Sequence, residues 1–413
     1  MRGRVVDMDE EGLGILENGI RVPFTVVGDH VEVHRTVNRF GKVLAKEFKV
    51  LEKSSLRQRP RCVHVGRCGG CLWGHVKYGE QLRLKRELFE RITGISAEIK
   101  GSPKVWSFRS VSNFIVTIRG MGLKEFGDPR TVVNLRECPV FSSRTPQYLH
   151  TLRAFLKETG LRPWGPKGGD VHYLQVREGK FTGDIMINII AHGEAKPEVL
   201  EAFRNYFSFA SSLYWSIKAD ERDDPKGEPL HVGGEPYIRE RILGVTYLIH
   251  PASFFQTNSY ALPLLLKAVE GFIDGSRVLD LYSGVGTFGV YLAKRGFEVE
   301  GVEINPFAVE MANRNAKIND VQAEFKVGRA EDVLIGSYDT VIVDPPRKGL
   351  KDGAKRLMKG PARIVYVSCN PRAFKLDYER HLSKVYRIED VILIDMFPHT
   401  PHVEAVVKLV RKF

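Results

Sequence analysis

The chain has 413 residues, of which 43% are hydrophobic and 10% aromatic, so it can form two to four domains around a large core and is not a disordered protein. Its apolar stretches fall short of a membrane span, and its first residues lack a signal-peptide pattern. We therefore expect a cytoplasmic protein that does not enter membranes. A net charge of +12 favours a polyanionic partner, most often nucleic acid, although a thermophile surface rich in Lys, Arg and Glu would share this charge.

Residues 1–54 predict a small all-β module. Short alternating segments at 4–6, 20–26 and 31–34 are separated by turn signals that contain Asn and Gly. Short strands with glycines and exposed basic residues are typical of a small barrel that binds oligonucleotides. A structural β cap without a ligand is the alternative.

Four of the five cysteines form a spaced set. Cys62, Cys68 and Cys71 make a C-x5-C-x2-C pattern, Cys138 follows in Glu-Cys-Pro, and Cys369 stands apart. An odd number of cysteines in a cytosolic chain argues against a disulfide framework, although a hyperthermophile could break that rule. The first four therefore predict a metal centre, and their spacing leaves an iron–sulfur cluster and a structural zinc site both open.

Residues 55–240 predict a mixed α+β central domain. A basic linker at 55–61 precedes the cysteines, a helix is expected at about 76–95, and strands are expected at 114–118, 174–177 and 183–190. Basic residues beside aromatic ones could form an RNA surface, although each of them singly is more often a solvated charge. Residues 140–240 contain no catalytic motif that we identify.

Residues 241–413 alternate regularly between strands and helices, which predicts a doubly wound sheet with parallel pairing between strands that a helix separates. Helices are expected near 259–272, 288–295 and 306–318. The expected strands are 277–280, 298–303, one ending at residue 327, 340–344, 364–368, 391–395 and 404–410.

A glycine loop follows the first of these strands, as Asp280-Leu-Tyr-Ser-Gly-Val-Gly-Thr-Phe-Gly289. Such a loop could bind NAD, with the acid Glu303 at the end of the next strand holding the ribose. However, the carboxylate of Asp280 would repel a pyrophosphate and suits a cationic sulfonium ligand. We therefore favour S-adenosylmethionine over NAD.

Two further motifs follow strands. Asp344-Pro-Pro-Arg347 could hold a planar base that has been taken out of its stack, and a rigid turn is the alternative. Cys369, in Ser-Cys-Asn-Pro, could add as a thiolate to C6 of a pyrimidine and make C5 a nucleophile toward a methyl group. Glu404 could then remove the C5 proton, and His399 and His402 are alternative bases. For Cys369, the alternative is that it only packs in the core and has no reactive role.

Together these motifs resemble the RNA 5-methyluridine (uracil-C5) methyltransferase family, in the branch with a TRAM domain and an iron–sulfur cluster. The resemblance rests on the glycine loop, on Asp344-Pro-Pro-Arg-Lys-Gly349, on Ser368-Cys-Asn-Pro371 and on Phe397-Pro-His-Thr-Pro-His-Val-Glu404. It extends to Phe254-Phe-Gln-Thr-Asn258, to the cysteine pattern and to the N-terminal module, so it covers nearly the whole chain.

The resemblance implies that Cys369 is the nucleophile and Glu404 the base of an enzyme that methylates C5 of a uridine in RNA. Its expected contacts with the methyl donor are Gln256, Tyr282, Gly284, Thr287, Glu303 and Asp344. Its expected contacts with the target uridine are Arg109, Phe255 and Asp344. Thr287 departs from the Asn that some bacterial members carry at this position.

The resemblance also implies that Cys62, Cys68, Cys71 and Cys138 hold a [4Fe–4S] cluster. The architecture favours an archaeal type of enzyme that acts on uridine 54 of tRNA. A 23S rRNA methyltransferase is the alternative, and a non-catalytic RNA-binding iron–sulfur protein is a third reading. No obligate protein partner is expected.

Overall fold

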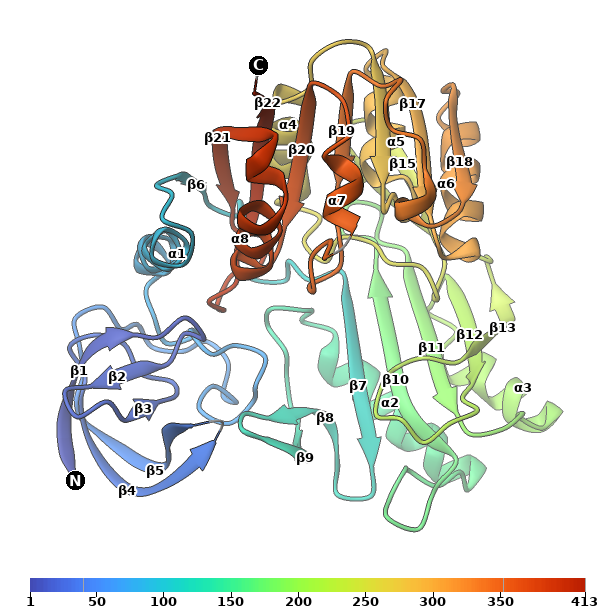
Figure 1. Cartoon of the computed structure of the whole chain (residues 1–413). Coiled ribbons are helices and arrows are strands. Elements are labelled where there is room, and N and C mark those ends of the chain that lie inside the picture. Colours follow the sequence, from blue (N-terminus) through green and yellow to red (C-terminus); the bar gives the residue numbers. More distant parts are fainter. Residues whose placement is uncertain (40, 352, 413) are drawn as a thin grey trace.

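The computed structural model describes residues 1–39, 41–351 and 353–412 and contains three regions (Figure 1). A small barrel lies beside a central sheet, and a larger C-terminal sheet with its helices lies above both. No helix among the described residues has the length and apolar character needed to cross a membrane.

The N-terminal region is a closed barrel with strand order β1-β2-β3-β5-β4, as the sequence predicts. Alternate side chains such as Val5, Val31 and Val33 fill its interior, as the two-residue period of a strand requires. The segment 20–26 is strand only at Arg21–Val22, because Pro23 lacks an N–H group for strand pairing. The strands are β1 (Arg2–Met8), β2 (Gly14–Leu16), β3 (Arg21–Val22), β4 (His30–Arg39) and β5 (Lys42–Glu52).

The central region has a seven-stranded sheet with the order β13-β12-β11-β10-β7-β8-β9. Apolar side chains of its strands and of helices α2 and α3 form a shared core, which confirms the mixed α+β prediction. The strands are β7 (Val111–Thr117), β8 (Gly120–Glu125), β9 (Asp128–Asn134), β10 (Val171–Glu178), β11 (Ile185–Ala191), β12 (Ser212–Ile217) and β13 (Glu228–Gly234). The helices are α2 (Thr145–Thr159) and α3 (Pro197–Tyr206).

The C-terminal region is a doubly wound sheet with the order β18-β17-β16-β19-β20-β22-β21-β6. Strands from β18 to β20 pair in parallel, whereas β22 pairs antiparallel with both of its neighbours. The strands are β16 (Arg277–Leu281), β17 (Glu298–Glu303), β18 (Ala323–Val327), β19 (Thr340–Val343), β20 (Arg363–Ser368), β21 (Tyr386–Ile394) and β22 (Glu404–Arg411). The helices are α4 (Leu262–Gly271), α5 (Thr287–Lys294), α6 (Pro306–Ile318), α7 (Gly353–Leu357) and α8 (Pro371–Arg380), with 3₁₀ turns at Ala330–Asp332 and Leu382–Lys384.

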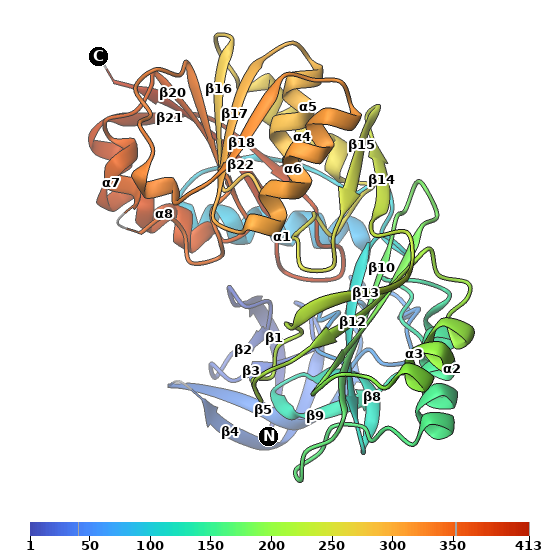
Figure 2. The ribbon, with the colours of Figure 1, turned by 90° about the vertical axis from the view of Figure 1, so that its right-hand side faces the viewer.

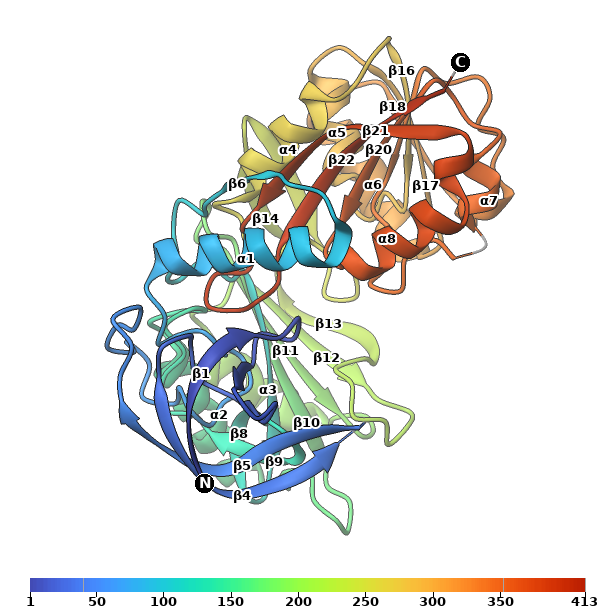
Figure 3. The ribbon, with the colours of Figure 1, turned by 60° about the vertical axis from the view of Figure 1, so that its left-hand side comes forward.

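Three elements join the regions. Helix α1 (Tyr78–Thr93) lies between the barrel and the C-terminal sheet, as Figures 2 and 3 show from two sides. Strand β6 (Glu98–Lys100) follows it and pairs with β21, although its residues fall within the range 55–240 that the sequence assigned to the central domain. The hairpin of β14 (Ile238–Ile242) and β15 (Val245–Ile249) leads from the central sheet into the C-terminal core.

Candidate active site and cysteine pocket

Four of the predicted site residues lie where neighbouring parallel strands end. Tyr282 directly follows β16, Glu303 is the last residue of β17, Asp344 directly follows β19, and Cys369 directly follows β20. These strands are adjacent in the order β17-β16-β19-β20. Since the carboxyl ends of parallel strands meet at one edge of a sheet, the four residues share that edge, which is where open α/β folds bind ligands.

Glu404 reaches the same edge from the opposite direction. It is the first residue of β22, and this strand pairs antiparallel with β20 so that Ser368 is opposite Ala405. The first residue of β22 therefore lies beside the residue that follows β20. The structure thus brings Cys369 and Glu404 together, as the sequence predicts for a nucleophile and a base.

Burial and like charge disfavour the ionised form of both groups. Burial raises the pKa of the Cys369 thiol to about 11, and the nearby carboxyl groups of Glu404 and Asp344 add to this shift while Arg347 opposes it. Burial also raises the pKa of Glu404 well above its usual value, and Asp344 adds to that shift. Among the described residues, Oε1 of Glu404 has no hydrogen-bond partner. A cation at this edge would favour the ionised form of each group.

The Asp344 loop is fixed from two sides. Asp377, on α8, accepts hydrogen bonds from the N–H groups of Leu350 at 2.6 Å and Lys351 at 3.0 Å, and from the Tyr366 hydroxyl at 2.7 Å. Nε2 of Gln256 donates to Oδ2 of Asp344 at 3.3 Å. The predicted pair Gln256 and Asp344 is therefore brought together.

Two carboxylates, those of Asp280 and Glu303, bind main-chain N–H groups of the glycine loop. Asp280 accepts a hydrogen bond from the N–H of Gly289 at 3.0 Å, and Glu303 accepts one from the N–H of Gly284 at 3.2 Å. Burial raises the pKa of Asp280 to about 8, and Asp344 and Glu303 add to the shift. Three acidic groups at one sheet edge suit a cationic ligand better than a pyrophosphate.

Two further residues shape this loop. Tyr282 has a φ of 62°, in the left-handed region that is uncommon for a non-glycine residue, and such strain is often found at ligand sites. Thr287 begins α5 and is buried, and its carbonyl accepts a hydrogen bond from the Tyr247 hydroxyl at 2.9 Å.

The two alternative bases, His399 and His402, both have lowered pKa values. Nε2 of His399 faces the carbonyl of Val105 at 2.9 Å and must donate to it, so Nδ1 accepts from Nε2 of Gln81 at 3.2 Å. Burial lowers the pKa of His399 to about 4, so the ring is neutral and both of its nitrogens are already bonded. Burial also lowers the pKa of His402 to about 4, and the neighbouring Arg347 adds to this shift. Of these candidate bases, Glu404 is the one with a free buried oxygen.

Two predicted uridine contacts lie away from this edge. Phe255 is only 2% exposed and packs against Tyr247 in the C-terminal core, whereas its neighbour Phe254 is 61% exposed. Arg109 lines the cysteine pocket described below, and its main chain bridges to Asn258. Their contacts with a uridine stay predictions.

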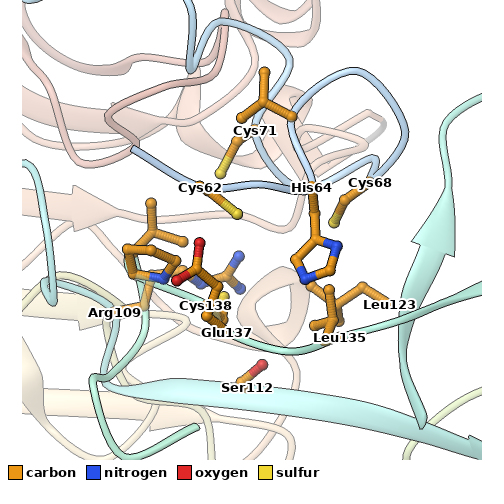
Figure 4. Close-up of a pocket in the computed structure, with 14 residues that line it drawn as sticks. Cys62, His64, Cys68, Cys71, Arg109, Ser112, Leu123, Leu135, Glu137 and Cys138 are labelled. Atoms are coloured by element: carbon orange, nitrogen blue, oxygen red, sulfur yellow. The ribbon is translucent and has the colours of Figure 1, made fainter. Parts of the chain in front are cut away.

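Cys62, Cys68, Cys71 and Cys138 line one pocket, and Figure 4 shows their sulfur atoms around a common space with Arg109 beside them. None of the cysteines forms a disulfide. Burial raises the pKa of all four thiols, to about 11 at Cys138, while backbone N–H groups at Cys62, Cys68 and Cys138 and the Arg109 charge beside Cys68, Cys71 and Cys138 oppose this shift. A metal group bound at these sulfurs would displace the thiol protons. The donor set therefore fits a group that is bound by four thiolates.

The sequence leaves an iron–sulfur cluster and a mononuclear zinc site open for these cysteines. In the described part of the chain, no three His, Cys, Asp or Glu side chains gather tightly enough to hold a single metal ion. In a [4Fe–4S] cluster each cysteine binds a different iron, so the sulfurs lie farther apart than around one zinc ion. Which of these groups the four cysteines bind stays a prediction.

Sequence reasoning missed one buried cation beside this site. Arg177, on β10, donates to the carbonyls of Pro251 at 3.3 Å and Ser253 at 2.9 Å, and so holds the segment that leads to Gln256. Burial lowers its pKa to about 10, and none of the described carboxylates forms an ion pair with it. The available signal was the segment Leu174-Gln-Val-Arg177, since an arginine on a strand predicted to be buried needs partners that the strand does not supply.

Comparisons with known proteins agree with this geometry. The family model of tRNA (uracil-5-)-methyltransferases matches residues 241–412, and a TRAM-domain model of tRNA (uracil(54)-C(5))-methyltransferases matches residues 1–56. A 23S rRNA (uracil(747)-C(5))-methyltransferase of Pyrococcus horikoshii is 60% identical over 100% of both chains. A tRNA (uracil(54)-C(5))-methyltransferase of Pyrococcus furiosus is 45% identical over 100% of both chains.

One solved structure is similar over the whole length. The crystal structure of the Pyrococcus abyssi tRNA (uracil-54, C5)-methyltransferase in complex with S-adenosyl-L-homocysteine matches with a TM-score of 0.90 and 42% identity, and the match covers 99% of each chain. This similarity includes the barrel, the central sheet and the C-terminal sheet.

Proposed function

The chain belongs to the family of RNA uracil-C5 methyltransferases that use S-adenosylmethionine, and we propose that its substrate within this family is a uridine of 23S ribosomal RNA. One observation carries the choice of substrate. Three Pyrococcus enzymes named for uracil 747 of 23S rRNA are 59–61% identical to this chain, whereas three named for uracil 54 of tRNA are 43–45% identical. All of them cover essentially the whole chain, so the difference does not come from a shared fragment.

A tRNA substrate is the second candidate. The sequence favoured position 54 of tRNA, and the similar solved structure is of an enzyme with that name. The TRAM-domain model that matches residues 1–56 is also named for that activity. The catalytic residues are the same under both candidates, so the choice concerns the RNA and not the chemistry.

The proposed chemistry uses the residues that share this sheet edge. The Cys369 thiolate adds to C6 of the uracil, and the electron pair of the C5–C6 double bond moves toward C5 and the C4 carbonyl. C5 then takes the methyl group from the sulfonium of S-adenosylmethionine. The Glu404 carboxylate removes the C5 proton, the bond from C6 to Cys369 breaks, and the thiolate returns. The products are 5-methyluridine and S-adenosylhomocysteine.

The same carboxyl groups explain how Cys369 becomes reactive. Asp280, Asp344 and Glu404 surround a position that suits positive charge, and their pKa values are raised by burial. A sulfonium and an ammonium group beside them would lower these pKa values and that of the thiol. Thiolate formation is therefore coupled to binding of the methyl donor.

The cysteine pocket would hold a [4Fe–4S] cluster through Cys62, Cys68, Cys71 and Cys138. The cluster would supply a cross-link between the segment 62–71 and Cys138, and the methylation itself moves no electrons. Trp73, close to Cys71, donates from its main chain to the carbonyl of His399 at 2.9 Å. The cross-linked segment is thus joined directly to the loop that precedes Glu404.

The test of the proposed function is methyl transfer from labelled S-adenosylmethionine to separate 23S rRNA and tRNA transcripts, with the product nucleoside mapped. We expect 5-methyluridine at one rRNA position. Label confined to the T-loop of tRNA would select the second candidate. Label in neither RNA, with donor and cluster present, would favour a non-catalytic RNA-binding protein. Cys369→Ala is the control that should give no label in any RNA.

A further inference from the structure

We propose that Gln81, on helix α1, is a positioning residue for proton removal by Glu404. The inference concerns residues 395–403, called the base loop here. They connect β21 to β22, and Glu404 follows them as the first residue of β22. It rests on the proposed role of Glu404 as the base. Helix α1 comes from a distant part of the sequence, yet it lies directly beside this loop.

Gln81 holds both the backbone and the ring of His399, in the middle of the base loop. Its Oε1 accepts the main-chain N–H of His399 at 2.7 Å, and its Nε2 donates to Nδ1 of the ring at 3.2 Å. Nε2 also donates to the carbonyl of Val76 at 2.8 Å. Gln81 is fully buried, so water cannot replace these bonds.

Three other groups also contact His399. The main-chain N–H of Trp73 donates to its carbonyl at 2.9 Å, Nε2 of the ring donates to Val105, and the ring stacks on Trp106 with 4.0 Å between centroids. Every polar atom of His399 therefore has a partner from outside the base loop. Such complete bonding is what a strained residue needs to persist.

His399 is strained. Its φ is 66°, in the left-handed region, and its side chain is fully buried. A non-glycine residue in this conformation costs free energy relative to the usual regions, so without its partners the base loop would relax toward another path. The hydrogen bonds from Gln81 and Trp73 oppose that relaxation.

The base loop is also anchored on both sides of His399. Lys85, likewise on α1, forms a fully buried ion pair with Asp395 at 2.5 Å and donates to the carbonyl of Phe397 at 2.9 Å. Pro401 packs against Gly12 of the barrel so closely that a side chain on Gly12 would overlap it. The base loop therefore has one path, and Glu404 lies at its end.

The expected defect is specific to one step. Cys369 and Asp344 follow β20 and β19, and within the described part of the chain no hydrogen bond or ion pair joins them to α1, so addition of the thiolate and methyl transfer should not depend on Gln81. Removal of the C5 proton depends on Glu404, and a displacement of about 1 Å can cost ~10²-fold in rate. Loss of the Gln81 bonds should therefore stall the enzyme after methyl transfer, with the RNA still attached to Cys369.

The experiment compares Gln81→Met with wild type under single-turnover conditions, using RNA with tritium at C5 of its uridines. Methionine keeps the volume and removes all of the hydrogen bonds. We expect tritium release to slow by ~10–100-fold, methyl transfer to change by less than about threefold, and a covalent RNA adduct to accumulate on a denaturing gel. Arg83→Met is the matched control, since Arg83 lies on the same helix and its bonds go to Glu80 and Glu87 on the surface.

A Glu404→Gln sample in the same assay separates the two proposals. An adduct with Glu404→Gln but none with Gln81→Met, with normal tritium release, would overturn the role of Gln81 alone. No adduct with Glu404→Gln would instead overturn the assignment of the base. Equal slowing of methyl transfer and tritium release in a folded Gln81→Met protein would also contradict a positioning role, because a general structural defect slows both.

A second pair of variants tests the strain directly and does not depend on how Gln81→Met folds. His399→Gly and His399→Ala both remove the ring, but only glycine adopts a φ of 66° freely. We expect His399→Ala to release tritium roughly 5–30-fold more slowly than His399→Gly. Equal rates for the two variants would show that the left-handed conformation does not control Glu404.

Discussion

The cysteine pocket and the active site both bury thiols, and burial raises the pKa of the thiols in both, but the charged neighbours differ. In the pocket, Arg109 and backbone N–H groups oppose the effect of burial on Cys68 and Cys138. At the active site, Glu404 and Asp344 lie beside Cys369 and add to the effect of burial. The second arrangement suits a sulfur that stays unreactive until a cationic methyl donor binds beside it, whereas the first lowers the cost of ionising several sulfurs in one pocket.

Removing the reactive thiol should have the largest effect. Cys369→Ala should lower methyl transfer by ~10⁴-fold or more, because no other side chain can add to C6. The thiol is only half-buried, so the melting temperature should stay within a few degrees of wild type. Labelled methyl transfer and thermal unfolding measure the two. Substantial residual activity would mean that covalent addition is not required.

Removing the buried carboxylate should stop the reaction later. Glu404→Gln should slow proton removal by ~10²–10⁴-fold and leave an RNA–protein adduct that proteases digest. The adduct is seen as a shifted band under denaturing conditions. Release of product at the wild-type rate would exclude Glu404 as the base. The contrast between the two thiol sites would then have no bearing on proton removal.

Breaking the pocket should affect stability more than chemistry. Cys71→Ala should lower the iron and sulfide content and lower the melting temperature by roughly 5–10 °C, since the cross-link would be lost. Methyl transfer per folded molecule should fall far less than in Cys369→Ala. Iron analysis, calorimetry and activity at a temperature below the transition measure these effects. Bound zinc in the wild type in place of iron would reassign the pocket to a mononuclear site.

The smallest expected effect concerns the protonation of the Cys369 thiol. Its pKa of about 11 predicts that alkylation by iodoacetamide, followed on the Cys369 peptide, rises about tenfold per pH unit between pH 7 and 10, because only the thiolate reacts. Glu404→Gln removes one of the groups that raise this pKa, so alkylation at pH 8 should be several-fold faster. A rate that levels off below pH 8 would show that the thiol is already ionised without its donor.

The catalytic edge could be predicted because its residues sit at fixed places in a local pattern. Asp344 and Cys369 each follow an apolar run directly, and parallel strands place such residues side by side. The glycine loop and its Asp280 are likewise recognisable within a few residues. The fold could be predicted for the same reason, since strand–helix alternation over residues 241–413 specifies a doubly wound sheet.

The rest depends on contacts between distant segments. Gln81 and Lys85 lie on a helix that reads as basic and exposed, yet they face the base loop more than 300 positions away in the sequence. Which of Phe254 and Phe255 is exposed depends on the path of an irregular segment that has no period to follow. The position of Arg109 in the cysteine pocket likewise depends on how residues 62–71 fold over the central sheet.

Strand β6 has a consequence for how this protein can be divided. It is three residues long, carries Glu98 and Lys100, and covers the main chain of β21 at Ile392–Ile394. Without it, that part of β21 would present unpaired N–H and carbonyl groups, a template on which strands from other molecules can add. A fragment that begins at residue 241 would keep the cofactor loop and Cys369 but lose the strand that covers this part of β21. We therefore expect the short, charged strand from the N-terminal half to limit self-association of the C-terminal sheet.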